Sequence, residues 1–563
     1  MRMSALIVVL GLLAGPSHAA EPEFLPTEAD AVGWAFQALQ SYPVEDQPFI
    51  RFVLIPPWGD PDWIKAVDVA VNLAASQTAV RIRGDLHAGG WLIGYNLRRL
   101  APDPKQLVRL IEVWDGIAID EAKLHVPKVN LVDVVQQFDA TVGGRVVKQS
   151  RTVKVQKRTA FLAPHLSAAL ARHVTDESKS QRVDVLVQQI TQSTGAIYPA
   201  DWFIEQLLTS AVGKYPEFLQ IDFKGAGGFN PLQTVLKEHG FFLEQSVDFL
   251  GDKGAYLIAS DVTGKNRIII YVYGLNGRYA AFTTFDFKDS RTAANEQLVR
   301  NLIEFRAFAD ASETFIPKRN GLPAGVLADA KGNILRVAPP DVVADQTKPK
   351  GHTTELEMGM SCIMCHWGIG QEPKLASNGY NTRRNDLEFL LGSDIDFLGD
   401  NIAVIRSGKK LVLTREQAVE ILSSRFGEPV DSPDGPWNRA RRDLVRIVTE
   451  ITGYPIQPDG KTAVQLVGEK IQEIYHGYRY NTIDAQRACL ELGVRVEAAQ
   501  ARQTLALLVP PPPKGQQEDI LISMLRNGAS IKRSDMDAVF SEMARRAMLS
   551  REAIKKEARN NGT

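Results

Sequence analysis

The stretch Met358-Gly359-Met360-Ser361-Cys362-Ile363-Met364-Cys365-His366-Trp367-Gly368 decides how the rest of the chain is interpreted. Two of the three cysteines, Cys362 and Cys365, stand here with two residues between them, and His366 follows directly. Cys-x-x-Cys-His is the attachment motif of a c-type haem, in which two thiols bond to the porphyrin vinyl groups and the adjacent imidazole binds the iron. The motif therefore predicts one covalent haem c on Cys362 and Cys365, with His366 as the proximal metal ligand.

Two other kinds of site use the same residue types. A Cys-x-x-Cys pair can be a redox dithiol, and His352, Cys362, Cys365 and His366 could be counted as a Cys2His2 zinc set. Adjacent Cys365 and His366 would chelate one tetrahedral ion awkwardly, and the usual His-x-x-x-His pair is missing. The flanks also lack the strand-to-helix pattern of a thioredoxin-like unit. The cellular compartment decides between these alternatives.

The N-terminus indicates export. Residues 1–4 supply a short positive segment, residues 5–14 (ALIVVLGLLA) an apolar run, and Ser17-His18-Ala19 small residues at a cleavage site. The apolar run is shorter than the ~20 residues that span a bilayer, and no cysteine follows it as a lipoprotein anchor would require. We expect a signal peptide over residues 1–20 and a periplasmic or secreted bacterial protein, which favours haem over zinc or dithiol chemistry.

The amino-acid composition limits which partners and locations we expect for the protein. The 563 residues carry a formal net charge of −1, with 44% hydrophobic and 23% charged residues, as in ordinary globular proteins. We therefore expect no nucleic-acid partner and no stable membrane span after signal cleavage, because no second apolar run is long enough. Cys489, in a half-apolar helical setting, is expected to be a buried, inert thiol.

The order of predicted elements indicates an α+β chain. Helical spacing occurs at 29–40, 63–75 and 104–114, and strand patterns at 51–57, 79–86 and 91–97. A basic segment at 138–160 predicts a hairpin, and further strands are expected before residue 338. We predict five parts along the chain: a signal peptide (1–20), an α+β unit (21–137), a second, strand-rich α+β unit (138–338), a haem-bearing, mainly helical cytochrome c-like domain (339–509), and a proline connector with C-terminal helices (510–563).

Short motifs spread along the chain accompany the haem motif: Arg51-Phe52-Val53, Val71-Asn72-Leu73, Asn96-Leu97-Arg98, Trp114, Asp201-Trp202-Phe203, Asn266-Arg267, Phe285-Asp286-Phe287, Asn320-Gly321-Leu322, Ala328-Asp329-Ala330-Lys331-Gly332-Asn333, Gly359-x-Ser361-Cys362, His366, Ala485-x-x-Ala488, Glu491-Leu492-Gly493 and Arg533-Ser534-Asp535. With them the chain resembles a family of large, secreted bacterial monohaem cytochromes c. These have a long α+β region, one Gly-x-Ser-Cys-x-x-Cys-His motif and a helical region after it. The resemblance implies haem binding and electron transfer, and no substrate. Met358 and Met360 depart from it, because relatives tend to have Asn and Ile there.

The sixth iron ligand stays open at this level. Met/His ligation raises a haem potential, whereas an open site permits ligand binding or peroxide chemistry. The sulfur- and imidazole-bearing candidates are Met358, Met360, His352, His476, Met524 and Met536. We expect an electron-transfer protein that serves redox partner proteins. The alternatives are a peroxidase- or oxidase-like haem enzyme with an open distal site, and a redox-sensing binding or scaffold protein.

Overall fold

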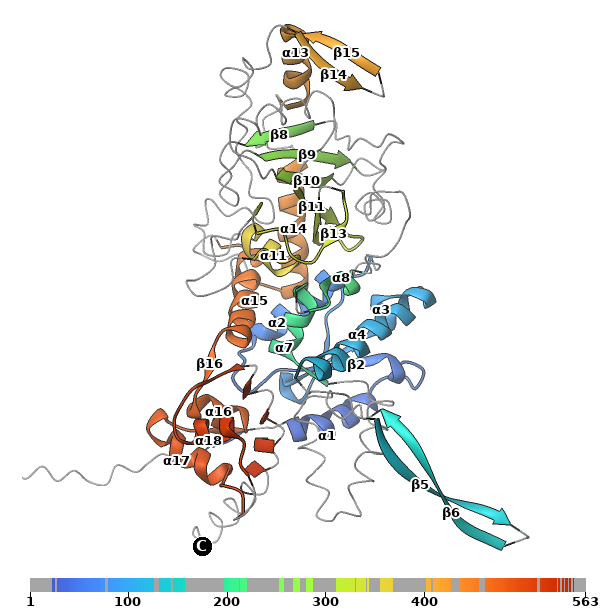
Figure 1. Ribbon diagram of the computed structural model, residues 1–563, viewed down its shortest axis with the longest axis vertical. Coiled ribbons are helices and arrows are strands. Elements are labelled where there is room, and N and C mark those ends of the chain that lie inside the picture. Colours follow the sequence, from blue (N-terminus) through green and yellow to red (C-terminus); the bar gives the residue numbers. More distant parts are fainter. Residues whose placement is uncertain are drawn as a thin grey trace, which may run out of the picture. The chain divides into compact units, whose positions relative to one another are not determined.

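The structure is a computed structural model (Figure 1). The residues it describes are 23–25, 28–75, 79–125, 131–142, 145–156, 197–211, 213–219, 253–257, 267–273, 280–286, 310–329, 331–340, 342–343, 355–367, 401–406, 409–426, 436–454, 461–513, 517–533 and most of 535–550. The signal peptide predicted over residues 1–20, and His352, lie outside these ranges. The chain divides into two compact units, one of residues 28–481 and one that joins residues 1–27 to 482–563.

A four-stranded sheet in the larger unit has the strand order β3-β4-β2-β7. Its members are β2 (Ile50–Leu54), β3 (Asp85–His87), β4 (Leu92–Asn96) and β7 (Ile197–Pro199). Every residue of β2 and β4 is buried. The mainly apolar run IRFVL, in which Arg51 is the one charged residue, suits a strand that is covered on both faces. β2 pairs antiparallel with β4 and parallel with β7.

Four helices of the same unit pack on one another: α2 (Asp62–Ala74), α7 (Ala200–Leu208), α14 (Pro436–Thr452) and α15 (Ala463–Arg479). α2 is buried without interruption from Ala66 to Ala74, as a helix enclosed by other elements must be. Its last carbonyls are satisfied by two side chains from the loop after β11. Lys318 Nζ and Asn320 Nδ2 donate to the Asn72 carbonyl at 2.9 and 2.8 Å.

The second sheet is a six-stranded antiparallel meander in which neighbours in sequence are neighbours in space (Figure 1). Its strands are β8 (Lys253–Leu257), β9 (Arg267–Tyr273), β10 (Ala280–Asp286), β11 (Ala311–Pro317), β12 (Pro323–Asp329) and β13 (Ile334–Leu335). β11 is buried from Ala311 to Ile316, polar residues included. Across β10 and β11, Thr283 and Thr314 share a hydrogen bond of 3.0 Å, which satisfies two buried hydroxyls.

The larger unit contains further elements. They are α1 (Glu28–Leu39), α3 (Leu97–Leu100), α4 (Pro104–His125), α8 (Tyr215–Phe218), α11 (Met360–His366), α13 (Arg415–Phe426), the hairpin β5 (Leu131–Val142) and β6 (Arg145–Gln156), and the hairpin β14 (Asn401–Arg406) and β15 (Lys409–Thr414).

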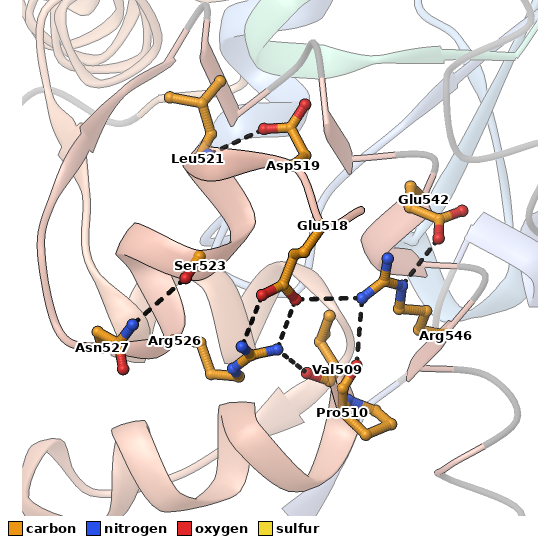
Figure 2. Close-up of polar contacts among 10 residues, drawn as sticks. All are labelled: Val509, Pro510, Glu518, Asp519, Leu521, Ser523, Arg526, Asn527, Glu542 and Arg546. Carbon is orange, nitrogen blue, oxygen red and sulfur yellow. Dashed lines mark hydrogen bonds and ion pairs between the residues drawn. The ribbon is translucent and has the colours of Figure 1, made fainter. Parts of the chain in front are cut away.

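The smaller unit consists of α16 (Ala485–Glu491), α17 (Ala498–Leu508), α18 (Ile520–Arg526) and short strand pairs, β1 (Glu23–Phe24) with β17 (Val494–Arg495) and β16 (Thr482–Ile483) with β18 (Ile531–Lys532). Figure 2 shows how its proline segment is held. Arg526 donates to both carboxylate oxygens of Glu518 at 2.6 and 2.7 Å, and Arg546 donates to Glu518 and to the Pro510 carbonyl. A bidentate arginine–carboxylate pair fixes orientation as well as distance.

The predicted α+β class is confirmed, because the described residues combine helices with a six-stranded sheet, a four-stranded sheet and several two-stranded pairs. The strand expected at 79–86 is wrong in most of its length, since only Asp85–His87 pairs in a sheet. The basic segment does form one arm of a hairpin, whose strands span 131–142 and 145–156. The five-part division and the cytochrome c-like helical domain stay predictions. Among the described helices, none is both long and apolar enough to cross a membrane.

Candidate haem attachment site

The motif helix α11 begins directly after Gly359, whose φ is 94°. A Cβ at Gly359 would lie 2.3 Å from the carbonyl oxygen of Leu208, at the end of α7, and 2.9 Å from the ring of Tyr215 in α8. Only glycine combines this left-handed backbone with such a close approach. Gly359 therefore fixes the start of α11 against α7 and α8.

Backbone pairing holds the segment before α11. Glu357 forms an isolated antiparallel bridge with Val337, and Met358 N donates to the Arg336 carbonyl at 3.0 Å. Ser361, in the first turn of the helix, accepts a hydrogen bond from the backbone N–H of Glu357 at 3.0 Å. These contacts tie the haem motif to the chain that follows the six-stranded sheet.

Cys362, Cys365 and His366 lie on one face of α11, because residues at positions i, i+3 and i+4 are neighbours on a helix surface. Cys362 is buried, with 4% of its surface exposed, and Cys365 is partly exposed. The His366 side chain is 15% exposed. Both thiols are free of disulfide bonds. The helix thus brings together all three residues that the sequence predicted.

Strands β11 and β12 pack against the face of α11 that carries Cys362, Cys365 and His366. The ring of Phe315 lies 4.1 Å from the ring of His366, centroid to centroid, at 50°. Glu313 Oε2 lies 3.8 Å from His366 Nε2, and the Glu313 side chain is close enough to Cys362 to raise the pKa of its thiol. A Cβ at Gly325 would lie 2.7 Å from Cys362 Sγ, so glycine lets the helix approach β12.

The electrostatics of the site keep the Cys362 thiol protonated. Burial is the main reason why the pKa of Cys362 lies well above its usual value, and the nearby Glu313 carboxylate raises it further. Tyr215, whose hydroxyl accepts from the Gly325 N–H at 3.2 Å, also has its pKa raised by burial. A buried, protonated thiol is a poor nucleophile and a poor metal ligand.

A buried charged cluster supports the segment before α11. Arg479 of α15 donates to Glu357 Oε1 at 2.7 Å and to the Tyr475 hydroxyl at 2.6 Å, and its Nε lies 3.9 Å from Glu205 Oε1 of α7. Glu357 is 1% exposed, so its charge depends on Arg479 for compensation. The cluster connects the haem motif to two helices far away in sequence.

The residues present match a c-type haem in donor type and in order along the helix, but their packing does not fit the group, because Cys362 is enclosed beside Gly325 and His366 Nε2 faces Glu313. Two thiols and an imidazole share one helical face, and Cys365 and His366 are partly exposed. Glu313 also lines a cavity of about 10 Å³ with Asp286 and Leu327, which has room for about one water molecule and none for a macrocycle.

Of the residues that the sequence offered as a sixth ligand, Met358, Met360 and His476 lie in the described part of the larger unit, and no contact given there brings them to the face of Cys362 and His366. Met358 and Met360 are packed in the hydrophobic core with 0% and 1% exposure. The His476 ring lies against Tyr475 and Tyr480 in α15. Met524 and Met536 belong to the smaller unit.

Cys489 is buried as predicted. Its thiol donates to the Ala501 carbonyl at 3.4 Å, and burial raises its pKa to about 12. Within the described part of the chain, no group of three or more His, Cys, Asp or Glu side chains is arranged to hold a metal ion.

Sequence reasoning missed Glu313, Phe315, Gly325 and Arg479. β11 was not predicted, so its residues could not be assigned to the site. One signal was present: Ala311 to Pro317 (ASETFIP) places a glutamate inside a run of strand-forming residues, and a carboxyl group in a buried strand needs a specific partner.

Comparison with known proteins adds no relative, because no family model, curated protein or solved structure matches this chain.

Proposed function

We propose that this chain is an exported c-type cytochrome, which binds one haem covalently through Cys362 and Cys365 and transfers single electrons between partner proteins. The observation that carries the proposal is the placement of two cysteines and a histidine on one face of α11, in the order that haem attachment requires. The apolar N-terminal run and the family resemblance support export and electron transfer.

Each residue has a distinct part in this function. A bound haem supplies one-electron redox chemistry. Cys362 and Cys365 would hold the haem covalently, and His366 would bind its iron. The Phe315 ring packs on the imidazole and restricts its rotation, while the glycine at 325 leaves room for the Cys362 side chain beside the sheet.

The rigid surroundings suit an electron carrier, because a site that barely moves needs little reorganisation when its charge changes. Met358, Met360 and Trp367 bury the flanks of α11 in the core. Gly359 and the Glu357–Arg479 pair hold its start. Fixed packing around a cofactor is also what preorganises its ligands.

The test is the absorption spectrum of full-length protein from a bacterial host with cytochrome c maturation, recorded in alkaline pyridine after reduction. We expect the spectrum of haem c, with the haem retained after denaturation. Cys362→Ala, Cys365→Ala and His366→Ala should each lower haem retention. Cys489→Ala is the matched control, because it removes the third thiol, which is buried and far from the motif in sequence, and it should keep the haem. The proposal would be refuted if the wild-type protein lacks haem while a control cytochrome matured in the same host carries it.

A second spectrum separates the electron carrier from a haem enzyme. Added cyanide should leave the spectrum of a six-coordinate electron carrier unchanged. A shift on cyanide addition would indicate an open distal site, and would replace the electron-carrier proposal by the peroxidase- or oxidase-like alternative.

A further inference from the structure

The proline segment, Pro510 to Pro513, lies in the smaller unit between α17 and α18. A proline ring fixes φ near −65°, and a residue that precedes a proline is held in the extended region of ψ. Consecutive prolines therefore set a polyproline II helix, which has three residues per turn. This places Pro510 and Pro513 on the same edge of the segment. Both are exposed, as is Pro511, whereas Pro512 is partly buried.

Two arginines hold the start of the proline segment, as Figure 2 shows. Arg546 Nη1 donates to the Pro510 carbonyl at 3.2 Å, and Arg526 Nη1 donates to the Val509 carbonyl at 3.5 Å. Both guanidinium groups also bind the Glu518 carboxylate, and their side chains are only 12% and 14% exposed. Val509 itself is buried. The segment is thus anchored at one end, and the prolines that follow the anchor are exposed in a fixed conformation.

The chemistry of the proline segment narrows the kind of partner that it fits. Proline has no backbone N–H, so the segment cannot donate to a strand and cannot extend the edge of a partner's sheet. Proline also breaks helices, so the segment cannot bind as an amphipathic helix. It offers rigid rings with carbonyl oxygens between them, which is the surface that aromatic-lined grooves recognise. Lys514 is the next residue in sequence and adds a positive charge at one end.

We propose that the proline segment docks a partner protein whose surface groove is lined with aromatic side chains and carries a carboxylate at the end that meets Lys514. This interaction goes beyond electron transfer and does not depend on haem. The prolines and the two arginines set the conformation of the segment before the partner arrives. Little conformational entropy is therefore lost when the segment binds, which strengthens binding through a small contact area.

The experiment titrates an isotope-labelled SH3 domain, whose proline-binding groove is aromatic and has an acidic border, with the full-length protein. NMR spectra of the domain show which of its residues contact the added protein. We expect signals from the aromatic groove to shift or broaden. The double variant Pro510→Ala/Pro513→Ala should bind at least about fivefold more weakly, as expected when central contacts are removed. Pro102→Ala, at an exposed proline of the larger unit, is the matched control and should bind as the wild type does.

Two more variants test the anchor and the charge. Arg546→Met removes the donor to the Pro510 carbonyl and leaves every proline in place. It should weaken binding by about two- to fivefold while the same groove signals respond, because a freed segment loses more entropy on binding. Lys514→Glu should also weaken binding, because it brings like charges together at the acidic border.

Three results would overturn the proposal: no binding of the wild type, a response confined to surfaces of the domain outside its groove, and equal binding by the wild type and Pro510→Ala/Pro513→Ala. Unchanged binding by Arg546→Met or by Lys514→Glu would overturn the role of the anchor or of the charge, respectively. Circular dichroism spectra equal to that of the wild type would show that a weaker variant is still folded. All of these measurements are independent of the haem spectra that test the proposed function.

Discussion

Replacing Gly359 with alanine should displace the motif helix, and the structure allows the cost to be worked out. A φ of 94° costs an alanine about 1–2 kcal/mol relative to glycine. The new Cβ would also lie 2.3 Å from the Leu208 carbonyl oxygen. That atom belongs to the backbone and cannot rotate away, so the segment must shift, at about 1–3 kcal/mol. The total is about 2–5 kcal/mol.

Gly89 supplies a matched control. Its φ is 70°, also left-handed, yet a Cβ there would have no atom within 4 Å. Gly89→Ala therefore carries the backbone cost of about 1–2 kcal/mol without the collision. Because ψ is −88° at Gly359 and 21° at Gly89, the difference between the two variants reports the less favourable backbone conformation of Gly359 together with its contact with α7.

Hydrogen exchange followed by mass spectrometry is the appropriate assay, because a chain with two compact units need not unfold in one step. In Gly359→Ala, amide protection of residues 355–367 should fall by about 30-fold or more, which corresponds to 2 kcal/mol. In Gly89→Ala, these peptides should keep wild-type protection. Unchanged protection of residues 355–367 in Gly359→Ala would refute the described start of α11.

Three further substitutions test buried polar groups. Arg479→Met leaves Glu357 buried without its cation and should lower the free energy of unfolding in urea by about 3–5 kcal/mol. Arg446→Met, in an exposed pair, is the control and should lower it by less than about 0.5 kcal/mol. Equal losses of stability in the two variants would contradict the role of Arg479. Lys318→Met removes the donor to the carbonyls at the end of α2 and should lower the free energy of unfolding by about 3 kcal/mol. A variant as stable as the wild type would refute this expectation. Burial raises the pKa of Asp68 to about 6 from 3.8. The folded state then binds the proton more tightly, so stability should fall by about 3 kcal/mol as pH rises from about 4 to about 6. Asp68→Asn should flatten that dependence, and an unchanged slope in unfolding midpoints would count against it.

Several local features of the fold correspond to short patterns in the sequence. Thr462 and Gln465 form both hydrogen bonds of a capping box at the start of α15, a feature that depends only on residues three positions apart. The turn at Lys331-Gly332-Asn333 joins β12 to β13 with Gly332 at φ 77°, as its residue types predict. These features depend on neighbours within a few residues, so a single sequence contains the information for them.

The environment of the haem motif depends on partners distant in sequence. Glu313 and Gly325 precede Cys362 by 49 and 37 residues, and Arg479 follows Glu357 by 122. No local pattern links such positions, because sheet register and helix packing bring them together only in the folded chain. The strand expected at 79–86 failed for a related reason: its residues bond to other groups, with Ile82 N donating to the Asn72 side chain at 3.0 Å and Gly84 N to Asp68.

The most direct test of the central claim is the mass of the peptide that contains residues 360–367, taken from full-length protein matured in a host that attaches haem to a control cytochrome. The proposed function predicts one haem covalently bound to this peptide, with neither Cys362 nor Cys365 open to alkylation after denaturation. A peptide of unmodified mass, with both cysteines alkylated and the control cytochrome fully loaded, would contradict it.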